Sequence, residues 1–384
     1  MKIAVIGGGA SGLTAAIAAA EKHDVTVFEK QNRLGKKILV TGNGKCNVSN
    51  AEITRESFGR FYRNASYAEK MFQTYDYVFL KKQLEQLGLE IKTDATGRAY
   101  PYSESAESVA DVLLTACKKR GVKQVLKGVK QILPQKNGFS VVTEEGKFNF
   151  DRVILAVGNV AGKREEFVDL LEGTHPYTSF VPSLVPLEVT PVLKQCDGVR
   201  VKAKVSLYDG KERRFAERGE VLFRKYGFSG IVVFNASSVW SGKATERLEL
   251  DLFPDFSESE LKQKLNYRFS VCGGSPRDLF RGLLHPKLTE ALCTLQREKR
   301  IGNNLDEWTN LLKHWQFRIT GPRSFSEAQV VRGGIRWDAI DENFQSKIWQ
   351  GLYFCGEILD IDGLCGGFNL HFALSSGYYV GHSI

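Results

Sequence analysis

The strongest constraint on the fold is a strand–helix–strand pattern at the N-terminus. Residues 3–6 form a short apolar run of the kind found in buried strands. Residues 13–21 are rich in alanine and favour a helix. Residues 25–28 form a second, β-branched run. This order predicts a βαβ unit in which the helix joins two parallel strands.

A glycine pattern lies between the first strand and the helix. Gly7, Gly9 and Gly12 have the spacing G-x-G-x-x-G, with Ala10 and Ser11 between them. Gly7 permits the tight turn, Gly9 lets the backbone approach a pyrophosphate, and Gly12 lets the helix pack close to the strand. The helix N-terminus offers N–H donors and partial positive charge to phosphates. We therefore expect a dinucleotide to bind here.

An acidic residue follows the second strand. Glu29 stands 17 residues after Gly12, where a carboxylate can accept hydrogen bonds from an adenosine ribose. A carboxylate at this place repels a 2′-phosphate. The bound nucleotide is therefore expected to be FAD or NAD rather than NADP.

The uncharged run over residues 3–20, preceded by Lys2, also resembles a signal peptide or a membrane span. Three consecutive glycines and a serine are unfavourable in a spanning helix, and the run continues directly into a matching second strand. We therefore expect neither an export signal nor a membrane span.

Composition sets broader limits. The 384 residues are enough for two or three domains, and 42% hydrophobic with 25% charged residues is ordinary for a soluble protein. Seven cysteines without a C-x-x-C or a Cys/His cluster predict no disulfide framework and no metal, which fits a reducing cytoplasm. The net charge of +9 favours anionic cofactors and substrates, and a nucleic-acid surface is the alternative.

A cationic, glycine-rich loop follows Glu29. In a dinucleotide fold it lies where the cofactor continues beyond its pyrophosphate, so we expect it to contact the cofactor. The alternative is a surface loop with solvated lysines. The residues expected to contact the cofactor are Lys30, Lys36, Lys37, Thr41, Gly42 and Asn43.

The strands that follow distinguish FAD from NAD. Residues 122–150 contain several short strands with turns, and residues 152–158 form a buried strand that ends on Gly158. An antiparallel meander before such a strand is the plan of FAD domains of the glutathione-reductase type. NAD dehydrogenases instead continue with βαβ units. We therefore predict FAD, bound non-covalently.

The chain changes character twice more. From residue 181 prolines and alternating strands predict an inserted β-rich part over residues 181–255, and helical signals predict a helical part over residues 256–320. Residues 1–180 and 321–384 then form one discontinuous FAD-binding domain of the α/β class. Residues 66–87 are expected to form one helix, and Trp315 is expected to end the apolar stripe of the last inserted helix.

The C-terminal region has a second flavin signal. A buried strand ends on Gly356 and Glu357, whose carboxylate is placed to bind the flavin ribityl hydroxyls. The segment Gly366-Gly367-Phe368-Asn369 opens a final helix, whose positive end would stabilise negative charge on the reduced flavin ring. A plain strand–turn–helix packing unit is the alternative.

These segments together resemble a bacterial family of NAD(P)/FAD-dependent oxidoreductases with aminoacetone-oxidase-like and bile-acid-reductase-like members. The resemblance runs nearly end to end and depends most on residues 35–47, 97–101, 219–223, 227–230 and 351–363. It implies a Rossmann-like FAD domain with an inserted β-barrel-like subdomain and a helical subdomain. It does not imply one substrate.

The chain departs from the family pattern at two places. It has Asn43 and Lys45 where members often have glycine and arginine, and Arg332 stands before a glycine pair. If that pair faces the flavin, Arg332 would favour anionic substrates.

The leading hypothesis is an enzyme in which FAD transfers a hydride between a reductant and a small organic substrate. No second G-x-G-x-x-G occurs, so NAD(P)H, if it is the reductant, would dock transiently. The available proton donors are Cys46, Tyr100, Tyr102 and His371. The two rival hypotheses are a flavoprotein that binds nucleic acid through basic stretches such as Arg213-Arg214, and a non-catalytic FAD protein. Because those arginines are not interleaved with aromatics, nucleic acid is the less favoured partner. No oligomeric state is predicted.

Overall fold

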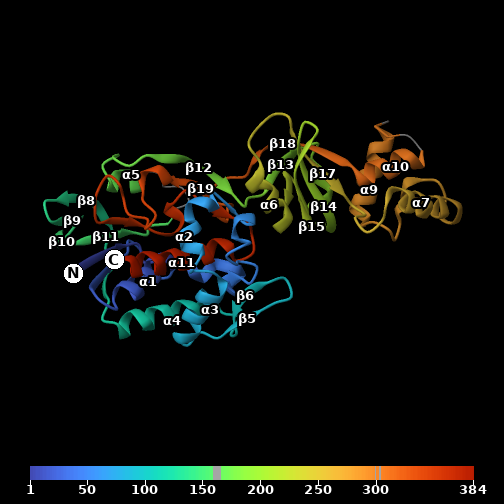
Figure 1. Ribbon diagram of the computed structural model, residues 1–384. Helices are drawn as coiled ribbons and strands as arrows, with labels where there is room; N and C mark the ends of the chain where they lie inside the picture. Colours follow the sequence, from blue (N-terminus) through green and yellow to red (C-terminus); the bar gives the residue numbers. More distant parts are fainter. Residues whose placement is uncertain (159–165, 299, 302–303) are drawn as a thin grey trace. The chain divides into compact units, whose positions relative to one another are not determined.

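The computed structural model describes residues 1–158, 166–298, 300–301 and 304–384 (Figure 1). The chain forms two compact units, each with its own buried hydrophobic core. Unit 1 comprises Met1–Val181 and Val330–Ile384, and unit 2 comprises Pro182–Gln329.

Unit 1 is built on a five-stranded parallel sheet. Its inner strands carry apolar residues that are almost completely buried, as expected for a sheet covered on both faces. Strand β1 is central, with Ile3 opposite Arg152 on one side and Val25 on the other. The order is β20 (Leu352–Phe354), β11 (Arg152–Leu155), β1 (Lys2–Ile6), β2 (Asp24–Phe28) and β7 (Lys123–Val125).

Helix α1 (Ala10–Ala19) packs against two other helices of this unit, α4 (Ala106–Lys119) and α11 (Phe368–Ser383). Helices α1 and α11 lie side by side although they come from opposite ends of the chain (Figure 1). The Thr14 hydroxyl of α1 donates to the Leu374 carbonyl of α11 at 2.9 Å. A Cβ atom on Gly377 would overlap the Thr14 side chain and the Ser11 carbonyl, so a glycine is needed there for close approach.

An antiparallel meander covers part of the parallel sheet. It consists of β8 (Val129–Gln135), β9 (Gly138–Thr143) and β10 (Gly146–Phe150). Phe150 of β10 packs edge-on against Phe28 of β2, with ring centroids 5.7 Å apart.

Smaller elements complete unit 1. They are β3 (Ser49–Asn50), β4 (Tyr62–Arg63), β5 (Ile91–Thr93), β6 (Arg98–Pro101), β19 (Val330–Ile335), β21 (Asp362–Gly363), α2 (Glu69–Phe72), α3 (Tyr77–Gln86) and α5 (Glu166–Leu170), with β12 (Tyr177–Ser183) passing from unit 1 into unit 2.

The prediction of one helix over residues 66–87 is wrong. The chain forms a 3₁₀ turn at Ala65–Ala68 and then α2, and α3 begins separately at Tyr77. Asp76 has an extended backbone, and its carboxylate accepts a hydrogen bond from the Phe79 N–H at 3.0 Å. This N-cap starts a new helix where the apolar periodicity continues without a break.

Unit 2 contains a closed antiparallel barrel. Its inward positions are apolar: Ala203, Val205 and Leu207 of β14 are buried, and their neighbours face outward. The strand order is β13 (Leu187–Thr190), β16 (Gly227–Ser229), β15 (Glu212–Arg224), β14 (Arg200–Asp209), β17 (Glu246–Asp251) and β18 (Trp315–Pro322).

The helices of unit 2 are α6 (Ile231–Val239), α7 (Glu258–Cys272), α8 (Pro276–Phe280), α9 (Pro286–Arg297) and α10 (Leu305–Lys313). Ser257 and Glu260 form the predicted capping box of α7. Trp308 of α10 is buried against Phe280, as expected for core. Trp315 does not belong to this helix, because α10 ends at Lys313 and Trp315 begins barrel strand β18.

The predicted fold class is confirmed: a Rossmann-like parallel sheet with a meander, a closed barrel and helices. The barrel and the inserted helices share one hydrophobic core in unit 2. The boundaries at residues 180, 255 and 320 stay predictions. None of the helices in the described parts of the chain is both long and apolar enough to cross a membrane.

We expect Gly377→Ala to destabilise unit 1, because the added methyl group overlaps backbone and side-chain atoms of α1. Overpacking of this kind typically costs about 1–3 kcal/mol, which outweighs the roughly 1 kcal/mol that alanine gains over glycine in a helix. Chemical denaturation measures the change. Gly59→Ala is the matched control, since a Cβ there meets nothing within 4 Å. Equal stability of Gly377→Ala and wild type would contradict the close packing of α1 and α11.

Candidate functional site

Two of the three motif glycines are required by packing within the protein. Gly7 has a φ of +108°, and a Cβ atom there would overlap the carbonyl oxygen of Ala156, the residue that follows β11. A Cβ on Gly12 would overlap the Gly7 carbonyl. The two glycines therefore allow the start of α1 to pack directly against the ends of β1 and β11, which is the close packing that the motif predicts.

Gly9 is different, because a Cβ there would meet no protein atom within 4 Å. Gly9 is the N-cap of α1, and no side chain caps this helix. The N–H groups of the first turn therefore have no side-chain cap, and the positive end of the helix dipole lies beside the open space at Gly9. An uncapped helix end beside a space that only glycine leaves open fits a pyrophosphate group.

Glu29 lies beside the same turn. One oxygen of its carboxylate accepts from the Gly8 N–H at 2.8 Å, and the other accepts from the Gln31 N–H at 2.8 Å. Each carboxylate oxygen has a second lone pair. Glu29 therefore fixes the glycine turn and retains acceptor capacity for ribose hydroxyls, which fits the adenosine half of FAD.

Three predicted residues from separate segments meet on the other side of the α1 N-terminus. Lys37 Nζ lies 3.4 Å from Glu357 Oε2. A Cβ on Gly158 would lie 3.7 Å from that same carboxylate oxygen and 3.9 Å from Lys37 Nζ. Lys37 and Glu357 are more than 300 positions apart in the sequence. They come together because the strands that precede Gly158 and Glu357 are neighbours in the parallel sheet.

The Gly356 backbone links this cluster to α1. A Cβ on Gly356 would overlap the Ser11 hydroxyl, and the Gly356 N–H donates to the Ser376 hydroxyl of α11 at 2.9 Å. Ser11 was expected to contact the cofactor only as a member of the glycine motif. Ser376 was not predicted, and its place within an apolar helical stretch carries no signal in one sequence.

Several residues of the glycine-rich loop make contacts within the protein. The Thr41 hydroxyl donates to the Ile38 carbonyl at 2.6 Å, and Gly42 and Asn43 have left-handed backbone conformations. Lys36 Nζ donates to the Gln31 side chain at 3.2 Å, and Lys30 is exposed. Cofactor contact by this loop stays a prediction.

The start of α11 is shaped by the protein itself. A Cβ on Gly367, which has a φ of +99°, would overlap the Ser49 carbonyl, and Gly366 accepts from the Asn50 side chain at 3.0 Å. The Asn369 amide closes the preceding loop through Gly363, with 2.8 Å bonds to both its N–H and its carbonyl. These glycines and Asn369 therefore have structural roles, and contact with flavin stays a prediction for them.

Phe368 is buried and stacks on Phe61, with ring centroids 4.5 Å apart and planes inclined by 18°. Its expected contact with the cofactor also stays a prediction.

Two of the four candidate proton donors are inaccessible. Cys46 is fully buried, and desolvation raises the pKa of its thiol to about 11. His371 is also fully buried, and desolvation lowers its pKa to about 3. Its Nε2 lies 3.1 Å from the Tyr75 carbonyl and its Nδ1 lies 2.8 Å from the Ser49 hydroxyl. Since a carbonyl oxygen only accepts, the neutral ring carries its proton on Nε2. Both ring nitrogens are therefore engaged in hydrogen bonds within the core.

The two tyrosines lie nearer the surface. Tyr102 is exposed, and Lys92 Nζ lies 5.5 Å from its ring centroid. Tyr100 is half-buried on β6. Both stay candidates by accessibility, and no observation places either one beside the reacting atoms.

A charged cluster that sequence analysis missed lies beside the C-terminal flavin segment. Asp362 is buried, and its Oδ1 accepts from Arg63 Nε at 2.7 Å and lies 3.6 Å from Arg332 Nε. Arg63 also pairs with Asp360. The charge of Arg332 is therefore balanced within the protein, which removes the reason to expect from this residue a preference for anionic substrates.

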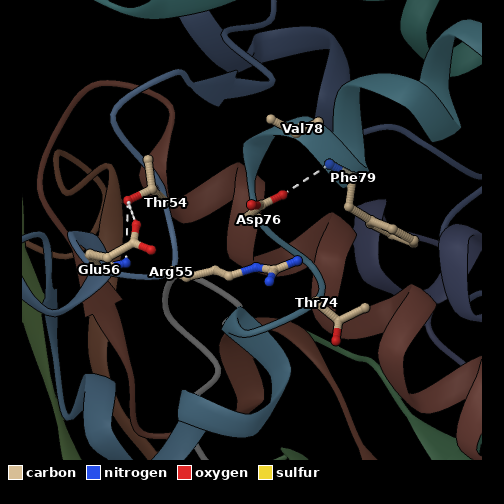
Figure 2. Close-up of a pocket in the computed structure, with 7 residues that line it drawn as sticks. All are labelled: Thr54, Arg55, Glu56, Thr74, Asp76, Val78 and Phe79. Carbon is tan, nitrogen blue, oxygen red and sulfur yellow. Dashed lines mark hydrogen bonds between the residues drawn. The ribbon is translucent and has the colours of Figure 1, made fainter.

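A surface pocket of about 510 Å³ lies elsewhere in unit 1 (Figure 2). Asp76 and Glu56 in its wall are engaged by Phe79 and Thr54, respectively. None of the residues expected to contact the cofactor lines it. The lining residues are Thr54, Arg55, Glu56, Thr74, Asp76, Val78 and Phe79.

Comparison with known proteins identifies the family of the chain. The profile of the HI0933-like protein Rossmann domain matches residues 1–383. The chain belongs to the HI0933-like family. The predicted membership of an FAD-dependent oxidoreductase family is thereby confirmed.

Two relatives with named activities match the chain over nearly their whole length. The chain is 31% identical over 408 residues to the 3-dehydro-bile acid delta(4,6)-reductase of Clostridium scindens, a match that covers 100% of this chain and 98% of the relative. It is 27% identical over 407 residues to the ribosomal RNA dihydrouridine synthase of Haemophilus influenzae, with 99% and 97% coverage. Among solved structures, the open form of a flavocytochrome c3 fumarate reductase matches with 13% identity and a TM-score of 0.49, over 99% of this chain and 77% of that one.

We expect Gly9→Val to prevent FAD binding and to leave the fold intact. The new side chain occupies space that is empty of protein atoms but lies against the N–H groups of α1. The flavin content after purification and the circular dichroism of the apoprotein check this result. Gly59→Val, also in open space, should keep its FAD. Full FAD occupancy in Gly9→Val would contradict a pyrophosphate at this helix end.

We expect His371 to make the folded protein less stable as the pH is lowered. Its folded-state pKa is lowered to about 3, so the unfolded chain takes up a proton below about pH 6.5 and the folded protein does not. The resulting loss between pH 7 and pH 5 is about 2 kcal/mol. Urea denaturation at the two pH values, with His371→Asn as the comparison, isolates this contribution because His175 remains in both. An unchanged pH dependence in the variant would show that His371 is not held neutral.

Proposed function

We propose that this FAD-dependent oxidoreductase is a reductase that saturates a carbon–carbon double bond conjugated with a carbonyl group. Support comes from what two relatives have in common. The reductase from C. scindens is named for the delta(4,6) double bonds of a 3-dehydro bile acid, and the enzyme from H. influenzae for making dihydrouridine. Both names describe addition of hydrogen across a C=C bond, although the substrates differ greatly in size.

The observation that carries the cofactor half of the proposal is the convergence at the α1 N-terminus. Open space at Gly9, the Glu29 carboxylate and the Lys37–Glu357 pair beside Gly158 lie along one edge of the parallel sheet. FAD bound there supplies the hydride chemistry.

The residues of this chain have separate tasks in the proposed complex. The N–H groups of α1 hold the pyrophosphate, and Glu29 holds the ribose. Glu357, oriented by Lys37, accepts hydrogen bonds from the ribityl hydroxyls. The uncapped N-terminus of the 16-residue helix α11 provides positive potential toward the flavin ring. NAD(P)H is the proposed transient electron donor.

Two kinds of substrate are candidates for this reaction. A small unsaturated ketone is the first, in line with the more similar relative. A uracil base in RNA is the second. It is favoured by the basic net charge of +9 together with the second relative. Both carry a C=C bond conjugated with a carbonyl.

The test is a pair of half-reactions under anaerobic conditions. The purified protein should contain FAD that acid releases, and NADH or NADPH should bleach its flavin absorbance. An α,β-unsaturated steroid ketone or a uridine-containing RNA should then restore the absorbance, whereas the matched saturated ketone should not. Reoxidation by neither unsaturated compound, with oxygen still effective, would contradict the proposed reaction.

A further inference from the structure

The barrel of unit 2 brings three cations and one aromatic residue, each from a different strand, into one outward-facing row. Arg318 of β18 is directly opposite Arg247 of β17, and Arg247 is opposite Tyr208 of β14. Tyr208 is in turn opposite Arg213 of β15. We call these four residues the barrel row. Tyr208, Arg247 and Arg318 each follow or precede a buried apolar residue on their strands, so their side chains lie on the outer face. Arg213 lies in an exposed charged stretch of β15, and a register shift there places it opposite the outward-facing Tyr208.

Fold stability does not explain this row. Like charges directly opposite each other on neighbouring strands are destabilising, and Arg318 and Arg247 occupy such a pair. Arg318 and Arg213 are exposed, and neither makes an ion pair or a side-chain hydrogen bond within the described residues. Two cations are therefore available to an external anion.

The acidic side chains around the row have other partners. Asp209 pairs with Lys243 and accepts from Thr245, each at 2.6 Å. Glu212 lies 3.6 Å from Arg214, and Glu249 pairs with His314 at 3.0 Å. These carboxylates are thus engaged by groups outside the row.

The middle of the row has a flat surface. The Arg247 guanidinium lies 4.8 Å from the Tyr208 ring centroid and donates to the Gly210 carbonyl, so it is held over the ring. Bases of single-stranded nucleic acid stack on aromatic rings and on guanidinium planes. A duplex, whose bases are already stacked, does not use such a surface.

We propose that the barrel row is a docking site for single-stranded RNA, in which Arg213 and Arg318 contact phosphates and the Tyr208–Arg247 pair stacks a base. Three inter-strand steps give the row a length of about 14 Å, enough to follow a short stretch of backbone. The choice of RNA over DNA rests on the proposed function, because uracil has the unsubstituted conjugated double bond. The row cannot be recognised in the sequence, because its arginines and its tyrosine lie on different strands and become neighbours only when the barrel forms.

The test measures RNA binding by the full-length, FAD-loaded protein. Fluorescence anisotropy of a labelled single-stranded RNA of about 16 nucleotides is followed as salt rises from about 50 to 200 mM. Arg213→Gln and Arg318→Gln should each weaken binding and reduce the slope of log K against log salt by about 0.7. The matched control is Arg60→Gln with Lys82→Gln, two exposed cations of unit 1, which should bind as wild type does.

Variants of Tyr208 distinguish the contribution of base stacking to RNA binding from the contribution of charge. Tyr208→Phe should keep RNA affinity, and Tyr208→Leu should weaken it by about tenfold without changing the salt slope. Failure of wild type to bind RNA, equal loss in the control variant, or equal competition by poly-glutamate, duplex RNA or single-stranded DNA would overturn the assignment. Reduction of the small unsaturated ketone is measured separately on wild type. Failure of the ketone alone removes only the first substrate candidate. Failure of both the ketone and the uridine-containing RNA to reoxidise the flavin contradicts the proposed function, and RNA binding is judged by itself in either case.

Discussion

The close packing of α1 against α11 is the contact on which the candidate site depends. It joins the first helix of the chain to the last through the Thr14–Leu374 hydrogen bond and through Gly377, where no side chain fits. The same contact places Gly356 against Ser11. The two halves of the proposed cofactor site, which lie at opposite ends of the sequence, are therefore held together by backbone packing before any ligand binds.

The parallel sheet explains why so much of this site is readable from the sequence. Parallel strands present their carboxyl ends at one edge, so residues just after β1, β2, β11 and β20 must lie near one another. Gly7, Glu29, Gly158 and Glu357 are such residues, and each is marked by a glycine or an acid directly after an apolar run. Their convergence follows from topology, and the contacts of Glu29 and Glu357 agree with it.

Other features depend on tertiary contacts that leave no local signal. Asp76 interrupts the predicted helix because its carboxylate caps α3, although the apolar spacing continues through it. His371 stands at the start of a helix beside the expected flavin segment, yet burial makes it a neutral core residue. Arg332, unusual in sequence, is balanced by Asp362, whose own strand pairs with the distant Tyr62–Arg63 strand. In each case the deciding partner lies at a sequence distance or in a conformation that periodicity does not encode.

The central claim is that FAD lies across the carboxyl edge of the parallel sheet with its pyrophosphate on α1. A crystal structure of the FAD-loaded protein tests it most directly. The claim predicts hydrogen bonds from the N–H groups of Ala10–Gly12 to the pyrophosphate and from the ribityl hydroxyls to Glu357. A dinucleotide bound away from the α1 N-terminus, with Gly9 still facing empty space, would contradict it.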